Sequence, residues 1–159
     1  SFNFGLSKNA FRVTNGFSTM KIGEDIDLTF RLWENNFHTQ FIEKAFVYHK
    51  RRTSLKQFFR QTFQFGNARP YLNRKYPDTA KITYWFPTLF MLFLLASLVF
   101  LFIGFKMPVA LFAIYFVALF LDSFIKNKKI SVAALSIVTT LIQFTGYGLG
   151  FLRGLLGIY

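Results

Sequence analysis

Three carboxylates stand close together in a chain that is otherwise strongly basic. Glu24, Asp25 and Asp27 lie near the start of the stretch 21–37, while the 159-residue chain carries a formal net charge of +12. Grouped carboxylates can move protons in catalysis. Acidic residues in the first turn of a helix can instead complement the helix dipole. The spacing by itself favours this second interpretation.

The residues around these acids predict the element that carries them. Four apolar residues recur at the spacing of one helix face, namely Ile26, Phe30, Trp33 and Phe37. Asp27 and Arg31 form a favourable i,i+4 pair, which makes Asp27 the structural member of the three acids. We therefore predict a helix from Glu24 to Asn35. The Asn-Gly pair within residues 14–17 predicts a turn before it.

Two segments on either side of this helix have the composition of strands. The N-terminal "SFNFGLSK" predicts a strand that ends at about Gly5. The stretch "TQFIEKAFVYHK" is rich in β-formers and predicts one or two short strands ending near His49. The first part of the chain is thus expected to mix helices with strands.

The second half of the chain is almost free of charge. Its charged residues are Lys106, Asp122, Lys126, Lys128, Lys129 and Arg153. Apolar runs occupy residues 83–105, 108–125 and 130–152, and about 20 such residues cross a bilayer as a helix. We predict three transmembrane helices. Glycines recur every fourth residue on the third, which suits close helix packing: Gly146, Gly150 and Gly154.

The distribution of lysines predicts how the chain is oriented. The "KNKK" cluster lies between the second and third runs, and basic connections stay on the cytoplasmic side. This places residues 1–82 in the cytoplasm and the C-terminus outside, although Arg153 weakly opposes the second placement. We expect a multi-pass protein of the cell membrane, namely the inner membrane of a bacterium.

The segment between the acidic stretch and the first apolar run predicts an amphipathic helix. Ser54 and Gln57 have the spacing of a capping box at its start. One face is apolar and is formed by Leu55, Phe58, Phe59, Thr62 and Phe63. The opposite face carries Arg60 among glutamines, so we expect the helix to lie on a membrane surface. "PYLNRKYPD" is expected to be a loop leading into the first span.

Two classes of function are disfavoured by composition. The chain has no cysteine, which excludes disulfides, thiolate metal sites and a cysteine nucleophile. Its basic residues and aromatic residues, which make up 21% of the chain, fit a membrane interface better than a nucleic-acid surface. We expect membrane lipids as partners and no nucleic acid.

Four motifs occur in order ahead of the apolar runs, namely "TNGF", "GEDIDLTFRL", "AFVYH" and "QFFRQ". Together with those runs, they resemble membrane-bound glycosyltransferases of family 2. "GEDIDLTFRL" resembles the E-D motif, in which an acidic pair opens a helix ending in "RL". "TNGF" resembles the family's G-G-F turn, and "AFVYH" a strand that commonly ends in His. "QFFRQ" resembles the Q-x-x-R-W motif, with Gln61 in place of Trp.

The resemblance implies a fold and a domain order. The fold is α+β, with a partial GT-A-like catalytic half at 1–53 followed by an α-helical membrane region. An interfacial helix and connection occupy 54–82, and the membrane region occupies 83–159. The family's nucleotide-binding half, with its D-x-D motif, has no counterpart here. The chain therefore looks like the C-terminal part of a longer enzyme and is expected to be inactive alone.

The resemblance also implies a reaction and roles for residues. It is an inverting transfer of a sugar from a nucleotide-sugar donor to a polysaccharide or lipid-linked acceptor, as in building the cell envelope. Asp25 would be the base and Glu24 its helper. Gln57 and Arg60 would lie near donor and acceptor, where Arg suits a diphosphate, although Arg60 fits anionic lipid equally well. His49 would touch the diphosphate or a metal.

Two further expectations complete the prediction. A divalent metal, Mg²⁺ or Mn²⁺, is implied by the resemblance, with its ligands mainly outside this chain and none assigned within it. The competing hypothesis is a non-enzymatic, basic membrane-anchored module that binds anionic lipid or a partner subunit. Binding by such a module would not depend on Glu24 or Asp25.

Overall fold

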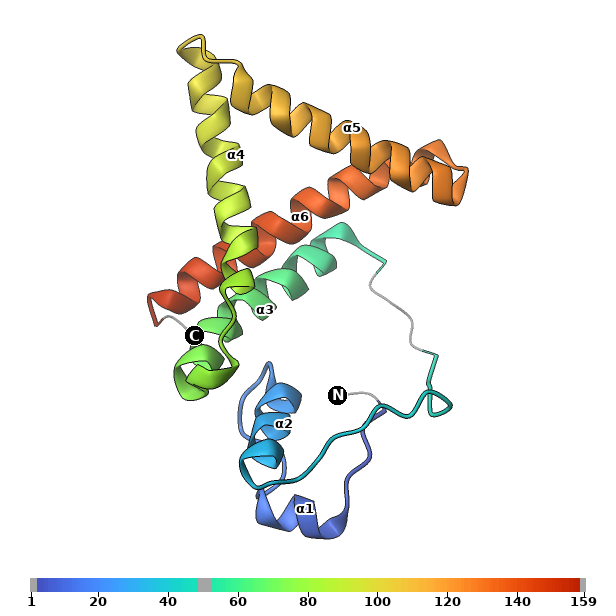
Figure 1. The fold of residues 1–159 in the computed structure, drawn as a ribbon, viewed down its shortest axis with the longest axis vertical. Helices are drawn as coiled ribbons and strands as arrows, with labels where there is room; N and C mark the ends of the chain where they lie inside the picture. Colours follow the sequence, from blue (N-terminus) through green and yellow to red (C-terminus); the bar gives the residue numbers. More distant parts are fainter. Residues whose placement is uncertain (1–2, 49–52, 158–159) are drawn as a thin grey trace.

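The structure is a computed structural model that describes residues 3–48 and 53–157. Both described ranges consist of helices joined by turns and irregular segments (Figure 1). The α-helices are α1 (Lys8–Val13), α2 (Glu24–Glu34), α3 (Leu55–Lys75), α4 (Phe86–Phe102), α5 (Met107–Asn127) and α6 (Ile130–Leu155). Two short 3₁₀-helices, η1 (Pro77–Thr79) and η2 (Ile82–Trp85), connect α3 to α4.

The α+β expectation is wrong, because no strand occurs in residues 3–48 or 53–157. Residues 3–7 and 39–48, where strands were predicted, have no regular structure beyond a turn. A strand needs a neighbour to bond its backbone N–H and C=O groups, and β-forming side chains cannot supply one. The end of the second predicted strand, including His49, lies outside the described residues.

The acidic helix is found where it was predicted. α2 begins at Glu24 and ends one residue before the predicted end. It packs on α1 through a small core of Ala10, Leu28 and Leu32. The predicted turn before it is also confirmed, since Asn15 and Gly16 both have positive φ, 56° and 65°.

α3 begins where it was predicted but extends further. It begins after Ser54 as expected, but the Ser54 side chain makes no capping hydrogen bond. It then continues to Lys75 through Pro70, where a loop was predicted. Proline disfavours a helix interior. Pro70 is nevertheless buried inside α3, and its Cδ lies 3.1 Å from the position that a Cβ would take at Gly154 of α6. Packing against α6 therefore outweighs local propensity here.

The glycines of α6 let α3 approach its backbone. A Cβ added at Gly150 would lie 2.0 Å from the backbone oxygen of Phe63. A Cβ at Gly66 of α3 would lie 2.1 Å from the backbone oxygen of Tyr147. Close packing at the glycine repeat, predicted from sequence, is confirmed, and its partner is α3.

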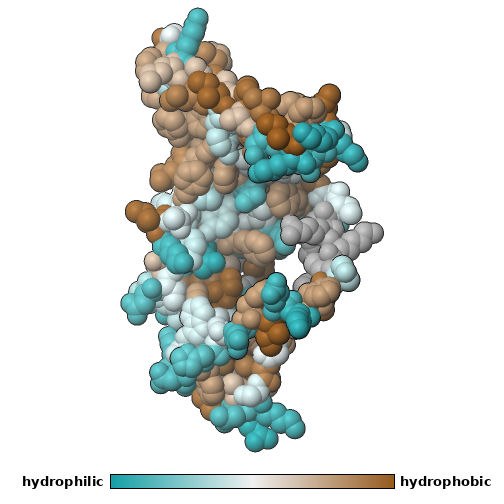
Figure 2. All heavy atoms as spheres, turned by 45° about the vertical axis from the view of Figure 1, so that its right-hand side comes forward, coloured by the Kyte–Doolittle hydropathy of each residue, from teal (hydrophilic) through white to brown (hydrophobic). Residues whose placement is uncertain are grey.

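Three helices are long and apolar enough to cross a membrane, as the three apolar runs predicted. They run over Ile82–Phe102, Met107–Asn127 and Ile130–Leu155. α4 and α5 diverge from their connecting turn, and α6 returns toward the start of α4 (Figure 1). Hydrophobic side chains dominate the surface over this upper part of the molecule, whereas hydrophilic ones are frequent below it (Figure 2). Asp122 pairs with Lys126 on the exposed surface of α5, at 2.9 Å.

The end of α6 lies beside the start of α4. A Cβ at Gly148 would lie 3.2 Å from Thr88 Cα, and the rings of Trp85 and Phe151 are 4.9 Å apart. Three spans that alternate in direction would separate these two ends across the bilayer. The expectation that the C-terminus lies on the opposite side from residues 1–82 stays a prediction.

Candidate functional site

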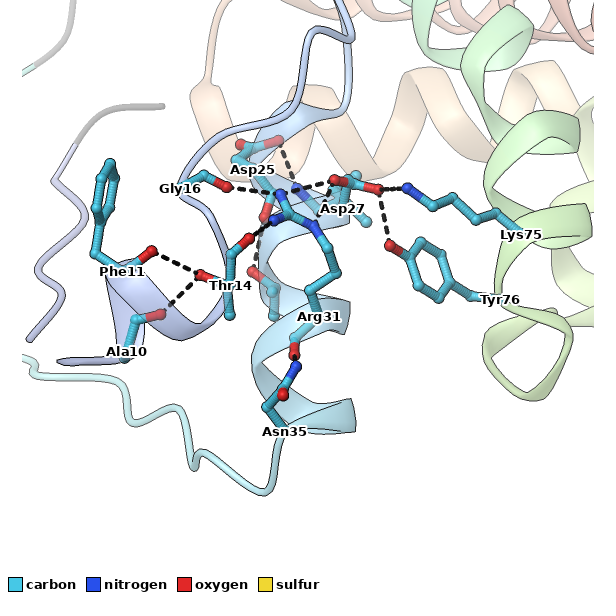
Figure 3. A network of polar contacts seen from close by, with 12 residues as sticks. Ala10, Phe11, Thr14, Gly16, Asp25, Asp27, Arg31, Asn35, Lys75 and Tyr76 are labelled. Carbon is cyan, nitrogen blue, oxygen red and sulfur yellow. Dashed lines mark hydrogen bonds and ion pairs between the residues drawn. The ribbon is translucent and has the colours of Figure 1, made fainter.

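Asp27 joins α2 to the end of α3 (Figure 3). Its side chain is fully buried. Oδ2 accepts a hydrogen bond from Arg31 Nε at 2.9 Å, which confirms the predicted i,i+4 pair. Oδ1 accepts from Lys75 Nζ at 2.6 Å and from the Tyr76 hydroxyl at 2.8 Å. Sequence reasoning missed these last two partners, which come from the far end of α3.

Arg31 extends this network to the turn before the acidic helix. Its Nη2 donates to the backbone oxygen of Gly16 at 2.8 Å, and its Nη1 donates to the backbone oxygen of Thr14 (Figure 3). Both carbonyls belong to the "TNGF" turn. One guanidinium therefore fixes the turn and Asp27 relative to each other.

The surroundings of Asp27 keep it ionised. Burial alone would raise its pKa, but hydrogen bonds from Lys75 and Tyr76 outweigh burial and hold the pKa below its ordinary value. The hydrogen bond to Asp27 in turn raises the pKa of Lys75. A carboxylate held by three partners is a poor proton acceptor, so Asp27 is a structural anion.

Glu24 and Asp25 have a different environment in the first turn of α2. Both are partly exposed. Asp25 Oδ1 accepts from the backbone N–H of Ile26 at 2.9 Å, which orients the carboxylate at the helix start. The preceding Gly23 has φ +83°, and a Cβ there would lie 3.3 Å from Leu72 of α3. The acidic pair therefore sits close to α3 while remaining accessible.

A pocket of about 490 Å³ lies between α3 and the segment that precedes α2. It is formed by the segment before the acidic pair and by one side of α3, with lining residues Thr19, Met20, Lys21, Ile22, Gln64, Asn67, Ala68 and Tyr71. We call it the α3 pocket. None of these residues was a predicted site residue, because the two segments are distant in sequence and share no motif.

The remaining predicted site residues are not gathered with the acidic pair. Gln57 and Arg60 are exposed near the start of α3 and line a separate pocket. An α-helix rises about 1.5 Å per residue, so Gln57 lies about 27 Å along α3 from Lys75, which binds Asp27. His49 is outside the described residues.

The divalent metal that the resemblance implies stays a prediction, because its ligands are expected mainly outside this chain. Within residues 3–48 and 53–157, no three His, Asp or Glu side chains cluster closely enough to hold a metal ion. Mg²⁺ and Mn²⁺ favour several oxygen ligands. We therefore derive no step through a metal at this site.

Comparison with known proteins identifies the class of enzyme. Residues 2–123, more than half of the chain, match the glycosyl transferase family group 2. The protein is therefore a glycosyltransferase with helices able to span a membrane. It belongs to glycosyl transferase family group 2, and the match includes α2, α3 and α4. No curated protein and no solved structure gave a match.

Proposed function

We propose that this chain carries the acceptor side of an inverting transfer from a nucleotide-sugar donor to a glycan or lipid-linked acceptor. The observation behind this proposal is that the carboxylates of the acidic motif differ in burial and in hydrogen bonding. Asp27 is buried and bonded to three side chains, whereas Glu24 and Asp25 are partly exposed and follow a segment that lines a pocket. An accessible carboxylate on a rigid helix start is suited to proton transfer.

In the proposed reaction, Asp25 takes the proton from an acceptor hydroxyl. The hydroxyl oxygen forms a bond to the anomeric carbon of the donor sugar. The bond from that carbon to the diphosphate breaks, and the nucleoside diphosphate leaves with its electron pair. Attack from the face opposite the leaving group inverts the anomeric centre. Glu24 positions the acceptor or Asp25.

Arg60 and Gln57 take a different role in this proposal from the one the resemblance implies. Along α3, Arg60 lies about 18 Å and Gln57 about 23 Å from Leu72, the residue that approaches Gly23 just before the acidic pair. Both are exposed near the start of α3, beside Lys56. This position favours contact with anionic headgroups over contact with the donor. His49 stays a predicted contact to the diphosphate.

The proposed location is a cell membrane with residues 1–82 in the cytoplasm, where nucleotide sugars are made available. The lysines at 126, 128 and 129 support this orientation. The non-enzymatic alternative is disfavoured by the family match, which covers the acidic motif.

The proposal is tested by transfer of labelled sugar. Membranes containing the full-length protein are incubated with UDP-, GDP- and dTDP-sugars labelled in the sugar. We expect one of them to release its nucleoside diphosphate and leave label in a membrane-bound or polymeric product with an inverted anomeric centre. Transfer with retention, or from none of these donors, would contradict the proposal.

A further inference from the structure

We propose that the α3 pocket binds a glycosyl unit of the acceptor and presents its hydroxyl to Asp25. This inference rests on the proposed function and names the substrate group that its acceptor side recognises. The pocket lies between two segments of the site. Thr19–Ile22 precede the acidic pair, and the other lining residues lie on α3.

The lining has the mixed character that a sugar ring requires. Gln64 and Asn67 contribute side-chain amides, each able to donate and accept hydrogen bonds from hydroxyls. Met20, Ile22 and Tyr71 contribute apolar or aromatic surface for the C–H faces of the ring. A mostly apolar wall with a few polar groups is typical of pockets that bind small molecules.

Asn67, which lines this pocket, has a side-chain oxygen without a hydrogen-bond donor among the described residues. This oxygen is buried. Its backbone is fixed against α6, since a Cβ at Gly150 or Gly154 would lie 2.9 or 2.4 Å from its backbone atoms. A ligand hydroxyl that donates to a reoriented Asn67 amide would satisfy this group.

The charge of the pocket favours the acceptor sugar over the donor diphosphate. Among its lining residues Lys21 is the cation, and the other side chains are neutral. Diphosphates are usually held by several cations or by a bidentate arginine. A neutral sugar needs none of these.

The position of the pocket suits delivery to the base. Ile22 lines it and is separated from Glu24 and Asp25 only by Gly23. The close approach of Gly23 to Leu72 holds that link against α3. A sugar in the α3 pocket would therefore lie next to the first turn of α2.

Protection of an engineered cysteine tests the inference, because the chain has no cysteine of its own. Ala68→Cys in the pocket and Thr53→Cys outside it are labelled with a maleimide in membranes containing the full-length protein. The probes are methyl glycosides of glucose, galactose, mannose and N-acetylglucosamine, with sorbitol as a polyol control.

At twice its dissociation constant, one glycoside is expected to slow labelling of Ala68→Cys about threefold. Thr53→Cys is expected to label at the same rate throughout. Adding Gln64→Leu to Ala68→Cys is expected to abolish the protection, whereas Gln143→Leu on α6 leaves it intact. Labelling that no glycoside slows, or that UDP slows instead, would overturn the inference.

Failure of this inference and failure of the proposed function are separable. Protection reports binding and does not require turnover. If labelled sugar is transferred and Asp25→Asn abolishes transfer, yet Ala68→Cys is never protected, the function stands and the pocket assignment falls.

Discussion

Asp25 and Asp27 stand two residues apart and have opposite surroundings. Asp27 is fully buried and bonded to Arg31, Lys75 and Tyr76. Asp25 is partly exposed at the end of the helix. Arg31 could be paired with Asp27 from sequence, because i,i+4 spacing is local. Lys75 and Tyr76 could not, because they lie 48 and 49 residues away.

At the residue scale, Asp27→Asn is expected to destabilise the protein by about 3 kcal/mol, because it leaves Lys75 and Arg31 without their anion. Thermal unfolding of the purified protein in detergent measures this effect. The matched control is Asp122→Asn, which removes a largely exposed ion pair and should change stability by less than about 0.5 kcal/mol. Equal effects of the two substitutions would contradict the structural role of Asp27.

The elements differ in how far local sequence determines them. α2 was predicted within one residue, because its apolar stripe and its i,i+4 pair lie within the helix itself. The strands were not found, because β-forming residues at 39–48 have no partner strand in the described ranges. α3 passes through Pro70 because α6 offers a glycine at the point of contact. That compensation could not be predicted from the segment containing Pro70.

At the element scale, Gly150→Ala is expected to cost about 2 kcal/mol by forcing α3 away from α6. The added Cβ would lie 2.0 Å from a backbone oxygen of α3, which cannot rotate away as a side chain can. Gly5→Ala is the control, because a Cβ there meets no atom within 4 Å. Unfolding temperatures that fall equally for both variants would contradict the close packing.

The whole molecule combines a predictable composition with an arrangement that was not predictable. Apolar runs of sufficient length identify candidate spans without reference to any neighbour, and three helices of that length and composition are present. The return of α6 to the start of α4 depends on contacts between segments about 60 residues apart, such as Thr88 and Gly148. Lysine positions bear only on the sides of the membrane and could not predict this contact, so the side on which the C-terminus lies stays a prediction.

At the scale of the whole molecule, the packing predicts that the end of α6 and the segment just before α4 share one side of the membrane. Single cysteines at Lys81 and Leu156, in otherwise unchanged protein, report this through a membrane-impermeant maleimide. Both are expected to label in inverted vesicles and to be protected in right-side-out ones. Labelling from opposite sides would show that α6 completes a third alternating span.

The central claim is that Asp25 acts in chemistry while Asp27 acts in structure. The most direct test is the sugar-transfer rate of Asp25→Asn, measured together with its unfolding temperature. We expect a loss of at least about 100-fold in rate, the usual contribution of a general base, at an unfolding temperature close to that of the unsubstituted protein. Transfer near the unsubstituted rate, at the same stability, would contradict the account.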